Sequence, residues 1–181
     1  MKVVPTSLPD VLLLEPRVFE DPRGWFFESF NQKSFFEATG LDARFVQDNL
    51  SRSAKNVLRG LHYQVAKPQG KLVSALRGEI HDVVVDLRRS SKTFRQWAGF
   101  RLTDATRAMA WIPPGFAHGF LVLSEIADVL YKVTEYWHAE HERTIAWNDA
   151  ELAISWPLAG APVLSARDAA GARFAEAELY P

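Results

Sequence analysis

Short runs of apolar, β-branched and aromatic residues recur along most of the chain, and each run is broken by glycine, proline or aspartate. Runs of this length and composition predict β-strands rather than helices. The predicted strands cover residues 11–14, 18–19, 25–30, 72–76, 80–87, 97–102, 108–112, 119–123 and 129–137. Many short strands at this spacing favour an all-β fold, either a sandwich or a barrel.

Helical signals are few and lie toward the two ends of the sequence. Residues 32–39 predict one helix, with Asn31 as its N-cap and Gly40 as its stop. After Trp156 the sequence becomes rich in alanine, and residues 168–179 predict one or two short helical turns. No repeat, low-complexity tract or linker divides the sequence, so we expect a single domain.

Alternation along two strands predicts which polar side chains face the interior. Tyr131 shares a strand face with the valines at 129 and 133, so it is expected to point into the barrel. The alternative is a core tyrosine whose hydroxyl finds a structural partner. His62 can also face inward, whereas Arg59 has the opposite parity. A β-bulge or a strand end would be needed to bring Arg59 and His62 into one pocket.

Several polar residues interrupt otherwise apolar strand runs. Because unpaired buried polar groups are costly, several of these residues are expected to line a solvated pocket in the barrel mouth. A histidine, a lysine and a tyrosine in one pocket supply a base, a cation for an oxyanion and an acid, as proton abstraction beside a carbonyl requires. Asp168 could orient an imidazole, or it could be an exposed N-cap. The polar residues are Arg59, His62, Gln64, Lys71, His118, Tyr131, Lys132 and Glu135.

One half of a cupin metal motif is present. The Pro-x-Gly-x-x-His pattern ends at His118, but the His-x-His pair expected upstream is reduced to His62 followed by Tyr63 and Gln64. We therefore expect no metal site here, because metal sites gather several ligands. A second histidine pair at positions 138 and 141 has a spacing of three rather than the four of helix-face zinc motifs, and its charged surroundings predict an exposed turn.

Composition narrows the class of protein. The 181 residues carry a formal net charge of −1, which disfavours a nucleic-acid partner held by bulk charge. There is no cysteine, which excludes disulfides, thiolate metal sites and a cysteine nucleophile and favours a reducing cytoplasm. No apolar stretch is long enough to span a bilayer, so we expect no membrane association.

Several motifs together resemble the dTDP-4-dehydrorhamnose 3,5-epimerase family, over about residues 12–168. That resemblance implies a metal-independent cupin jelly roll without cofactors, usually a homodimer with exchanged N-terminal strands. It implies one domain over residues 1–181, with strands shared across the dimer in about 1–45, a barrel core in about 46–150 and short helices in about 151–181. The motifs span residues 19–24, 47–49, 59–64, 69–73, 78–83, 113–120, 131–136 and 145–149.

The resemblance also implies a reaction and roles for individual residues. Members invert C3 and C5 of dTDP-4-dehydro-6-deoxy-D-glucose to give dTDP-4-dehydro-L-rhamnose. His62 is similar to the family's base, oriented by Asp168, and Tyr131 to its acid. Lys71 would stabilise the enolate oxygen. His118 would lie beside the sugar. The implied nucleotide and diphosphate contacts are Arg23, Phe26, Glu28, Gln47, Asn49, Arg59, Glu142 and Arg167.

The sequence departs from the family pattern at two positions, and three rival functions share parts of the pattern. His81 stands where the family has an aromatic residue, and Arg167 where lysine is common; arginine keeps the charge but changes the geometry of a phosphate contact. A relative that inverts only C3 or only C5 of another deoxysugar would share the same motifs. The second rival is a non-catalytic cupin that binds a nucleotide sugar. The third is a metal-dependent cupin oxygenase or isomerase.

Overall fold

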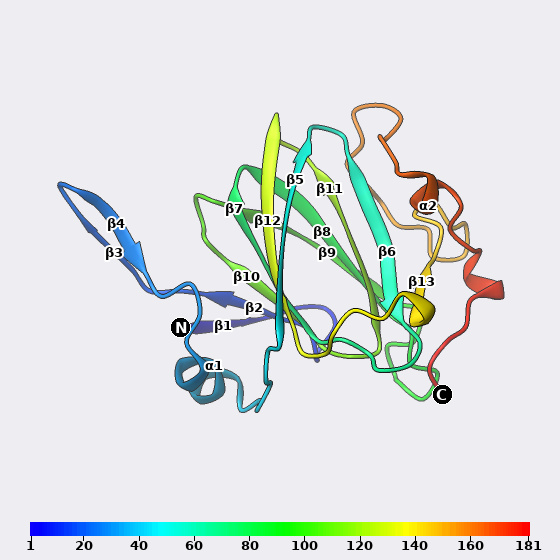
Figure 1. Cartoon of the computed structure of the whole chain (residues 1–181), viewed down its shortest axis with the longest axis horizontal. Helices are drawn as coiled ribbons and strands as arrows, with labels where there is room; N and C mark the ends of the chain where they lie inside the picture. Colours follow the sequence, from blue (N-terminus) through cyan, green and yellow to red (C-terminus); the bar gives the residue numbers. More distant parts are fainter.

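The computed structural model describes residues 1–181, and two antiparallel sheets form its body (Figure 1). The first sheet has six strands in the order β1-β2-β10-β7-β12-β5, and the second has five in the order β13-β6-β11-β8-β9. The strands of the first sheet are β1 (Lys2–Pro5), β2 (Leu12–Glu15), β10 (Met109–Ile112), β7 (Lys71–Arg77), β12 (Ile126–Val133) and β5 (Gln47–Ala54). Those of the second are β13 (Glu142–Thr144), β6 (Leu58–Gln64), β11 (Phe116–Val122), β8 (Glu79–Asp86) and β9 (Trp97–Thr103). The predicted all-β architecture is confirmed.

Alternation along the strands builds the core between the sheets. The largest buried cluster has 15 residues and includes Val73, Val84 and Val129, all fully buried. Leu8 and Val11 join it from the segment between β1 and β2. The β-branched side chains predicted to lie in strands therefore face inward, and burying them supplies the main stabilising term for the fold.

The predicted helix agrees with the structure to the residue. Helix α1 spans Gln32–Thr39, the side chain of Asn31 accepts from the Ser34 N–H at 3.1 Å, and Gly40 ends the helix with φ +72°. Local capping chemistry sets both ends. Three predicted strands are wrong by three or more residues at one or both ends: β4 ends at Phe27, β12 covers Ile126–Val133, and β11 begins at Phe116.

The C-terminal segment runs along the outside of the five-stranded sheet. It contains α2 (Ala166–Ala169) and the 3₁₀ turn η2 (Phe174–Glu176), and a further 3₁₀ turn, η1 (Ala139–His141), precedes β13. Tyr63 on β6 donates to the carbonyl of Glu178 at 2.9 Å, and the Tyr180 hydroxyl donates to the carbonyl of Gln64. These contacts hold the segment that carries α2 against β6, the strand of His62.

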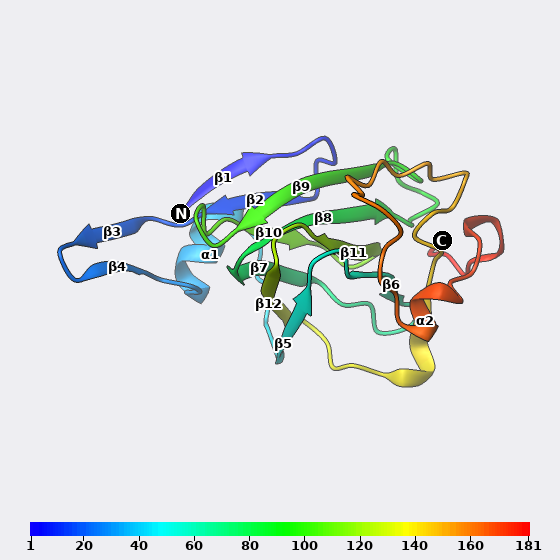
Figure 2. The same ribbon diagram turned by 90° about the horizontal axis from the view of Figure 1, so that it is seen from above.

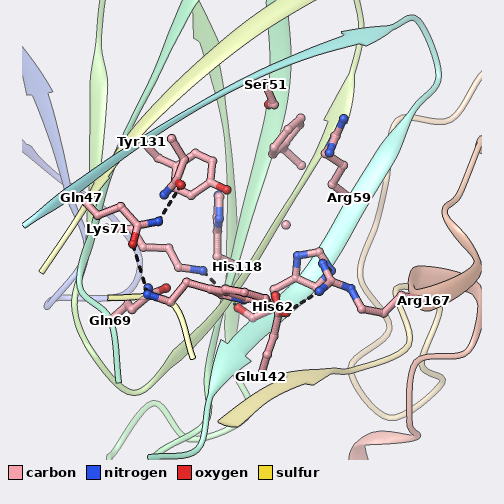
Figure 3. A pocket seen from close by; sticks show the side chains of 14 residues that line it. Gln47, Ser51, Arg59, His62, Gln69, Lys71, His118, Tyr131, Glu142 and Arg167 are labelled. Atoms are coloured by element: carbon pink, nitrogen blue, oxygen red, sulfur yellow. Dashed lines mark hydrogen bonds and ion pairs between the residues drawn. The ribbon is translucent and has the colours of Figure 1, made fainter. Parts of the chain in front are cut away.

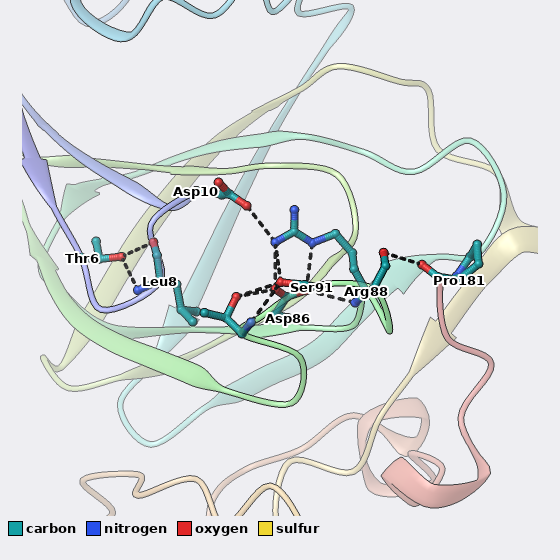
Figure 4. Close-up of polar contacts among 9 residues, drawn as sticks. Thr6, Leu8, Asp10, Asp86, Arg88, Ser91 and Pro181 are labelled. Atoms are coloured by element: carbon teal, nitrogen blue, oxygen red, sulfur yellow. Dashed lines mark hydrogen bonds and ion pairs between the residues drawn. The ribbon is translucent and has the colours of Figure 1, made fainter.

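A buried polar network joins distant parts of the chain (Figure 4). Asp86 is fully buried and accepts from the guanidinium of Arg88 at 2.8 and 2.9 Å, from Ser91 at 2.6 Å and from Thr93 at 2.7 Å. Arg88 also donates to Asp10 at 2.8 Å, in the segment before β2. The network therefore links the N-terminal segment to the turn after β8.

One hairpin stands away from the body of the molecule. Strands β3 (Val18–Asp21) and β4 (Gly24–Phe27) pair only with each other and project to one side (Figures 1 and 2). Phe19 is 48% exposed, Trp25 59% and Phe26 66%. No helix in the structure is long and apolar enough to cross a membrane.

Candidate active site

A polar pocket of about 380 Å³ opens between the two sheets (Figure 3). Strands of both sheets supply its walls: β5, β7 and β12 from one, β6, β11 and β13 from the other. This is the pocket predicted from polar residues inside apolar strands. Its lining residues are Gln47, Asn49, Ser51, Arg59, His62, Gln69, Lys71, His118, Gly119, Phe120, Tyr131, Trp137, Glu142 and Arg167.

A β-bulge brings Arg59 and His62 to the same pocket, as their opposite parities require. Arg59 lies opposite Phe120 on β11, whereas His62 lies opposite His118, so one extra residue is accommodated on β6. Gly60 has φ +123°, and a Cβ there would lie 2.5 Å from the Cα of Gly119. The close approach of the two strands therefore depends on glycine.

His62 and Asp168 form a hydrogen-bonded dyad. Their Nε2 and Oδ1 atoms are 2.5 Å apart, and the His62 side chain is 20% exposed. Burial by itself would raise the pKa of Asp168, but hydrogen bonds from His62 and Ser165 outweigh it and lower that pKa. The ionised carboxylate accepts a hydrogen bond from the Nε2–H group, which leaves Nδ1 as the unprotonated, basic nitrogen. Burial lowers the pKa of His62 despite Asp168, so the imidazole is neutral near pH 7.

Asp168 is positioned by its own helix. Ser165, the N-cap of α2, donates to Asp168 Oδ2 at 2.8 Å and accepts from the Asp168 N–H at 3.1 Å. The N–H of Gly60 lies 3.4 Å from Oδ1. The prediction that Asp168 orients an imidazole is therefore consistent with the geometry, and the alternative of an exposed N-cap is wrong because Asp168 is 3% exposed.

Lys71 and Tyr131 complete the predicted acid–base set. Burial lowers the pKa of Lys71 to about 8, although Glu142 and Asp82 oppose the change. The Lys71 Nζ lies 3.3 Å from the carbonyl oxygen of His62. Burial raises the pKa of Tyr131, so the phenol keeps its proton at neutral pH. A cation for an oxyanion and a neutral acid thus share the pocket with a neutral base.

His118, which lines the pocket, belongs to a second histidine–aspartate pair. His118 is paired with His62 across β6 and β11, and its Nε2 lies 2.8 Å from Oδ2 of Asp82. Asp82 is fully buried, and its Oδ1 has no hydrogen-bond partner. The sequence does not single out Asp82, because it alternates with apolar residues of β8 and resembles a turn residue.

The remaining pocket wall carries paired charges. Arg167 forms an ion pair with Glu142, and Trp137 donates from its indole to Glu142 at 3.0 Å. Gln47 donates to Asn49 at 2.8 Å on β5. All of these except Trp137 are among the predicted binding residues. The sequence places Trp137 at the end of a strand before an exposed turn; in the structure β12 ends earlier and the indole lines the pocket.

Three predicted binding residues lie outside this pocket. Arg23 is at the tip of the β3–β4 hairpin, where it pairs with Asp21, and Phe26 is on the same hairpin. Glu28 follows the hairpin and accepts from Asn31 at 2.8 Å. Within one chain the hairpin extends away from the sheets, so none of the three lines the pocket of its own chain.

Further polar residues serve the scaffold. Lys132 pairs with Asp48 on the outer face, and the Glu135 side chain accepts from the Tyr136 N–H. His81, the departure from the family pattern, packs against Trp156 with ring centroids 6.0 Å apart and lies outside the pocket. No group of three or more histidine, aspartate or glutamate side chains is placed to hold a metal ion.

Comparison with known proteins assigns the family. A model of the family described as dTDP-4-dehydrorhamnose 3,5-epimerase matches residues 5–176. The chain is 59% identical to the dTDP-4-dehydrorhamnose 3,5-epimerase of Pseudomonas aeruginosa, over 100% of both chains. It is 38% identical to the dTDP-4-dehydrorhamnose 3-epimerase of Streptomyces niveus, over 98% of this chain and 86% of the relative.

A solved structure agrees with these sequence matches. The crystal structure of dTDP-6-deoxy-D-glucose-3,5-epimerase from Legionella pneumophila, in complex with dTDP-4-keto-L-rhamnose, superposes with a TM-score of 0.95. The two sequences are 48% identical, and the match covers 98% of this chain and 94% of the crystallised one. The chain therefore belongs to the dTDP-4-dehydrorhamnose 3,5-epimerase family and has its cupin jelly-roll fold.

Proposed function

We propose that this enzyme inverts C3 and C5 of dTDP-4-dehydro-6-deoxy-D-glucose, giving dTDP-4-dehydro-L-rhamnose. The observation that carries the proposal is a neutral base and a neutral acid on facing sheets, with a buried lysine in the same pocket. His62 is on β6 and Tyr131 is on β12. Inversion needs a proton removed from one face of the sugar and returned on the other, and the two side chains meet that need.

The chemistry at each carbon uses the same groups. His62 Nδ1 takes the proton from C3 or C5, and the electron pair of the broken C–H bond moves into the C4 carbonyl to form an enolate. Lys71 stabilises the developing oxyanion as a preorganised cation. Tyr131 then donates its proton to the opposite face of the carbon. Because C3 and C5 both flank C4, one oxyanion site serves both inversions.

The nucleotide end of the substrate is assigned to the charged and aromatic wall. Arg59 and Arg167 supply guanidinium groups for the diphosphate, each worth about 1.5–3 kcal/mol if desolvated. Gln47 and Asn49 supply amides, and the exposed indole of Trp137 offers a flat surface for a base. His118 lies close to the sugar. Glu142 holds Arg167 in place.

We further propose a homodimer in which the β3–β4 hairpin reaches the partner's pocket. The support is the projecting hairpin with its exposed aromatic residues and the exposed Leu50 and Leu76 on β5 and β7, which a second copy would cover. Arg23, Phe26 and Glu28 would then contact the nucleotide across the interface. Because β1 and β2 pair with their own sheet in this chain, we assign the shared part to the hairpin. A cytoplasmic location stays a prediction.

The decisive experiment is incubation of the purified enzyme with dTDP-4-dehydro-6-deoxy-D-glucose in D₂O, with NMR at C3 and C5 read separately. We expect deuterium at both carbons and an L-rhamnose configuration in the product. Activity should persist after exhaustive EDTA treatment, since no step uses a metal. Inversion at a single carbon would identify a C3 or C5 epimerase instead. Binding without any deuterium wash-in would identify a non-catalytic nucleotide-sugar binder.

A further inference from the structure

The backbone after β12 is held by the side chains of three glutamines, one on β5, one on β6 and one in the segment before β7. Gln69 donates to the carbonyl of Glu135 at 2.9 Å, and Gln47 accepts from the N–H of Trp137 at 3.2 Å. Gln64 bonds to the residues on either side of Trp137. Residues 135–138 form no helix or strand, so these side chains provide partners that a sheet would otherwise provide.

Gln64 uses its whole amide in this role. Its Nε2 donates to the carbonyls of Lys67 at 2.9 Å and Tyr136 at 3.3 Å, and its Oε1 accepts from the His138 N–H at 2.8 Å. The residue is 3% exposed. Gln47 and Gln69 line the pocket, but Gln64 does not. Its side chain is therefore assigned to the loop and not to a ligand.

The residue between the two anchor points is Trp137. Its side chain is 55% exposed and lines the pocket, and its indole donates to Glu142, which pairs with Arg167. Glu142 is also the direct neighbour of Gln64 in the β6–β13 pairing. The buried amide of Gln64 thus holds the backbone on both sides of Trp137. Gln64 is also paired with Glu142, which lines the same pocket from β13.

An exposed aromatic side chain on an irregular loop would ordinarily be mobile. Holding its backbone before the ligand arrives reduces the conformational entropy lost on binding, which raises affinity without a new contact. Such an effect acts on binding of the ground state and the transition state alike, so it changes KM more than kcat.

We propose that Gln64 is a positioning residue that holds Trp137, and through it Glu142 and Arg167, ready for the nucleotide part of the substrate. The identity of the bound group rests on the proposed function; the anchoring of the loop does not. Gln64 stands at the position of the second histidine in the broken His-x-His motif, where a metal-dependent cupin would have a metal ligand. In this chain that position is used to anchor the loop.

The test compares two variants with a matched control. In Gln64→Glu a carboxylate replaces the amide that faces two carbonyl oxygens, and Gln64→Met removes all three bonds at similar volume. We expect the dissociation constant for dTDP and the KM to rise about tenfold in both, with a smaller change in kcat. Gln96→Glu makes the same chemical change at an exposed residue outside the pocket and should leave all three constants unchanged.

Amide exchange separates anchoring from function. In both variants, exchange should accelerate in residues 134–141 and not in β7 or β8. In the wild type the His138 amide should exchange far more slowly than a solvent-exposed amide, a measurement that needs no variant to fold. Free exchange of that amide, or a dTDP dissociation constant within twofold of wild type in folded Gln64→Met, would overturn the proposal. If the wild type binds dTDP but turns over no substrate, the proposed function fails while the loop anchor is still tested.

Discussion

Tyr131 and His62 come from different sheets. Replacing the hydroxyl group of Tyr131 with hydrogen separates the role of the acid from that of the base. Tyr131→Phe keeps the volume of the side chain, so the protein should fold normally. With His62 and Lys71 intact, a proton can still leave and return on the same face. We therefore expect deuterium to enter the substrate while inversion falls roughly 10²–10⁴-fold, the usual cost of losing a positioned acid. NMR of the substrate and product in D₂O measures both.

His62→Ala is the control for that experiment. It removes the base, so both exchange and inversion should disappear together. If Tyr131→Phe inverts its substrate at the wild-type rate, Tyr131 is not the acid. It is then a packed core tyrosine, the alternative that strand alternation also allows.

Residues are predictable from the sequence where one motif or one strand face specifies them. Lys71 and Tyr131 interrupt apolar strand runs, so their inward direction follows from alternation. Asp82 and Trp137 are missed because neither stands out locally. Asp82 matters through His118, which reaches it from another strand. Trp137 matters because side chains distant in sequence hold its backbone.

Among the elements, α1 is predictable and the ends of β12 are not. The ends of α1 depend on two neighbouring residues, Asn31 and Gly40, whose capping chemistry is local. The aromatic residues after Val133 favour a strand, but the glutamine side chains compete for their backbone groups and end the pairing. The sequence predicts that a bulge or a strand end is needed to bring Arg59 and His62 together, but it does not predict where the bulge lies. Its position depends on the close approach of Gly60 to Gly119 on another strand.

The hairpin gives a prediction at the element scale. If Arg23 acts in the partner's pocket, His62→Ala and Arg23→Glu are each inactive alone but complement each other after mixing and subunit exchange. A hybrid dimer has one pocket with both residues intact. Random exchange should therefore restore about a quarter of the wild-type activity, because half of the dimers are hybrids with one working site.

Mixing His62→Ala with Asp168→Asn is the control for complementation. Both residues belong to the hydrogen-bonded dyad of one chain, so no hybrid dimer restores them together. Equal activity in the two mixtures, or none in either, would rule out sharing of the hairpin.

For the whole molecule, the Asp86 network predicts how stability depends on pH. Burial would raise the pKa of Asp86, but hydrogen bonds from Arg88, Ser91 and Thr93 lower it to about 2. A depressed folded-state pKa stabilises the protein above the ordinary value of 3.8, and that stability is lost as pH falls toward 2. Asp86→Asn should therefore lower the free energy of unfolding by about 2 kcal/mol at pH 7. The deficit should shrink at pH 3.

Urea unfolding at fixed protein concentration measures this difference. Asp10→Asn is the matched control, because Asp10 bonds to the same guanidinium but its side chain is 57% exposed. It should cost less than half as much. Equal losses in the two variants would mean that burial of Asp86 contributes nothing.

Lys71 also has a consequence for chemical probes of this family. An amine with a pKa of about 8 has its nitrogen lone pair free in a substantial fraction of molecules slightly above neutral pH, whereas an ordinary lysine is almost wholly protonated there. That lone pair lies in a pocket built to receive a ketone. A nucleotide carrying an aldehyde at the sugar position would place an electrophile beside Lys71, where an imine can form and be trapped by reduction. The lysine that stabilises an oxyanion during turnover is thus also a site for covalent inhibition.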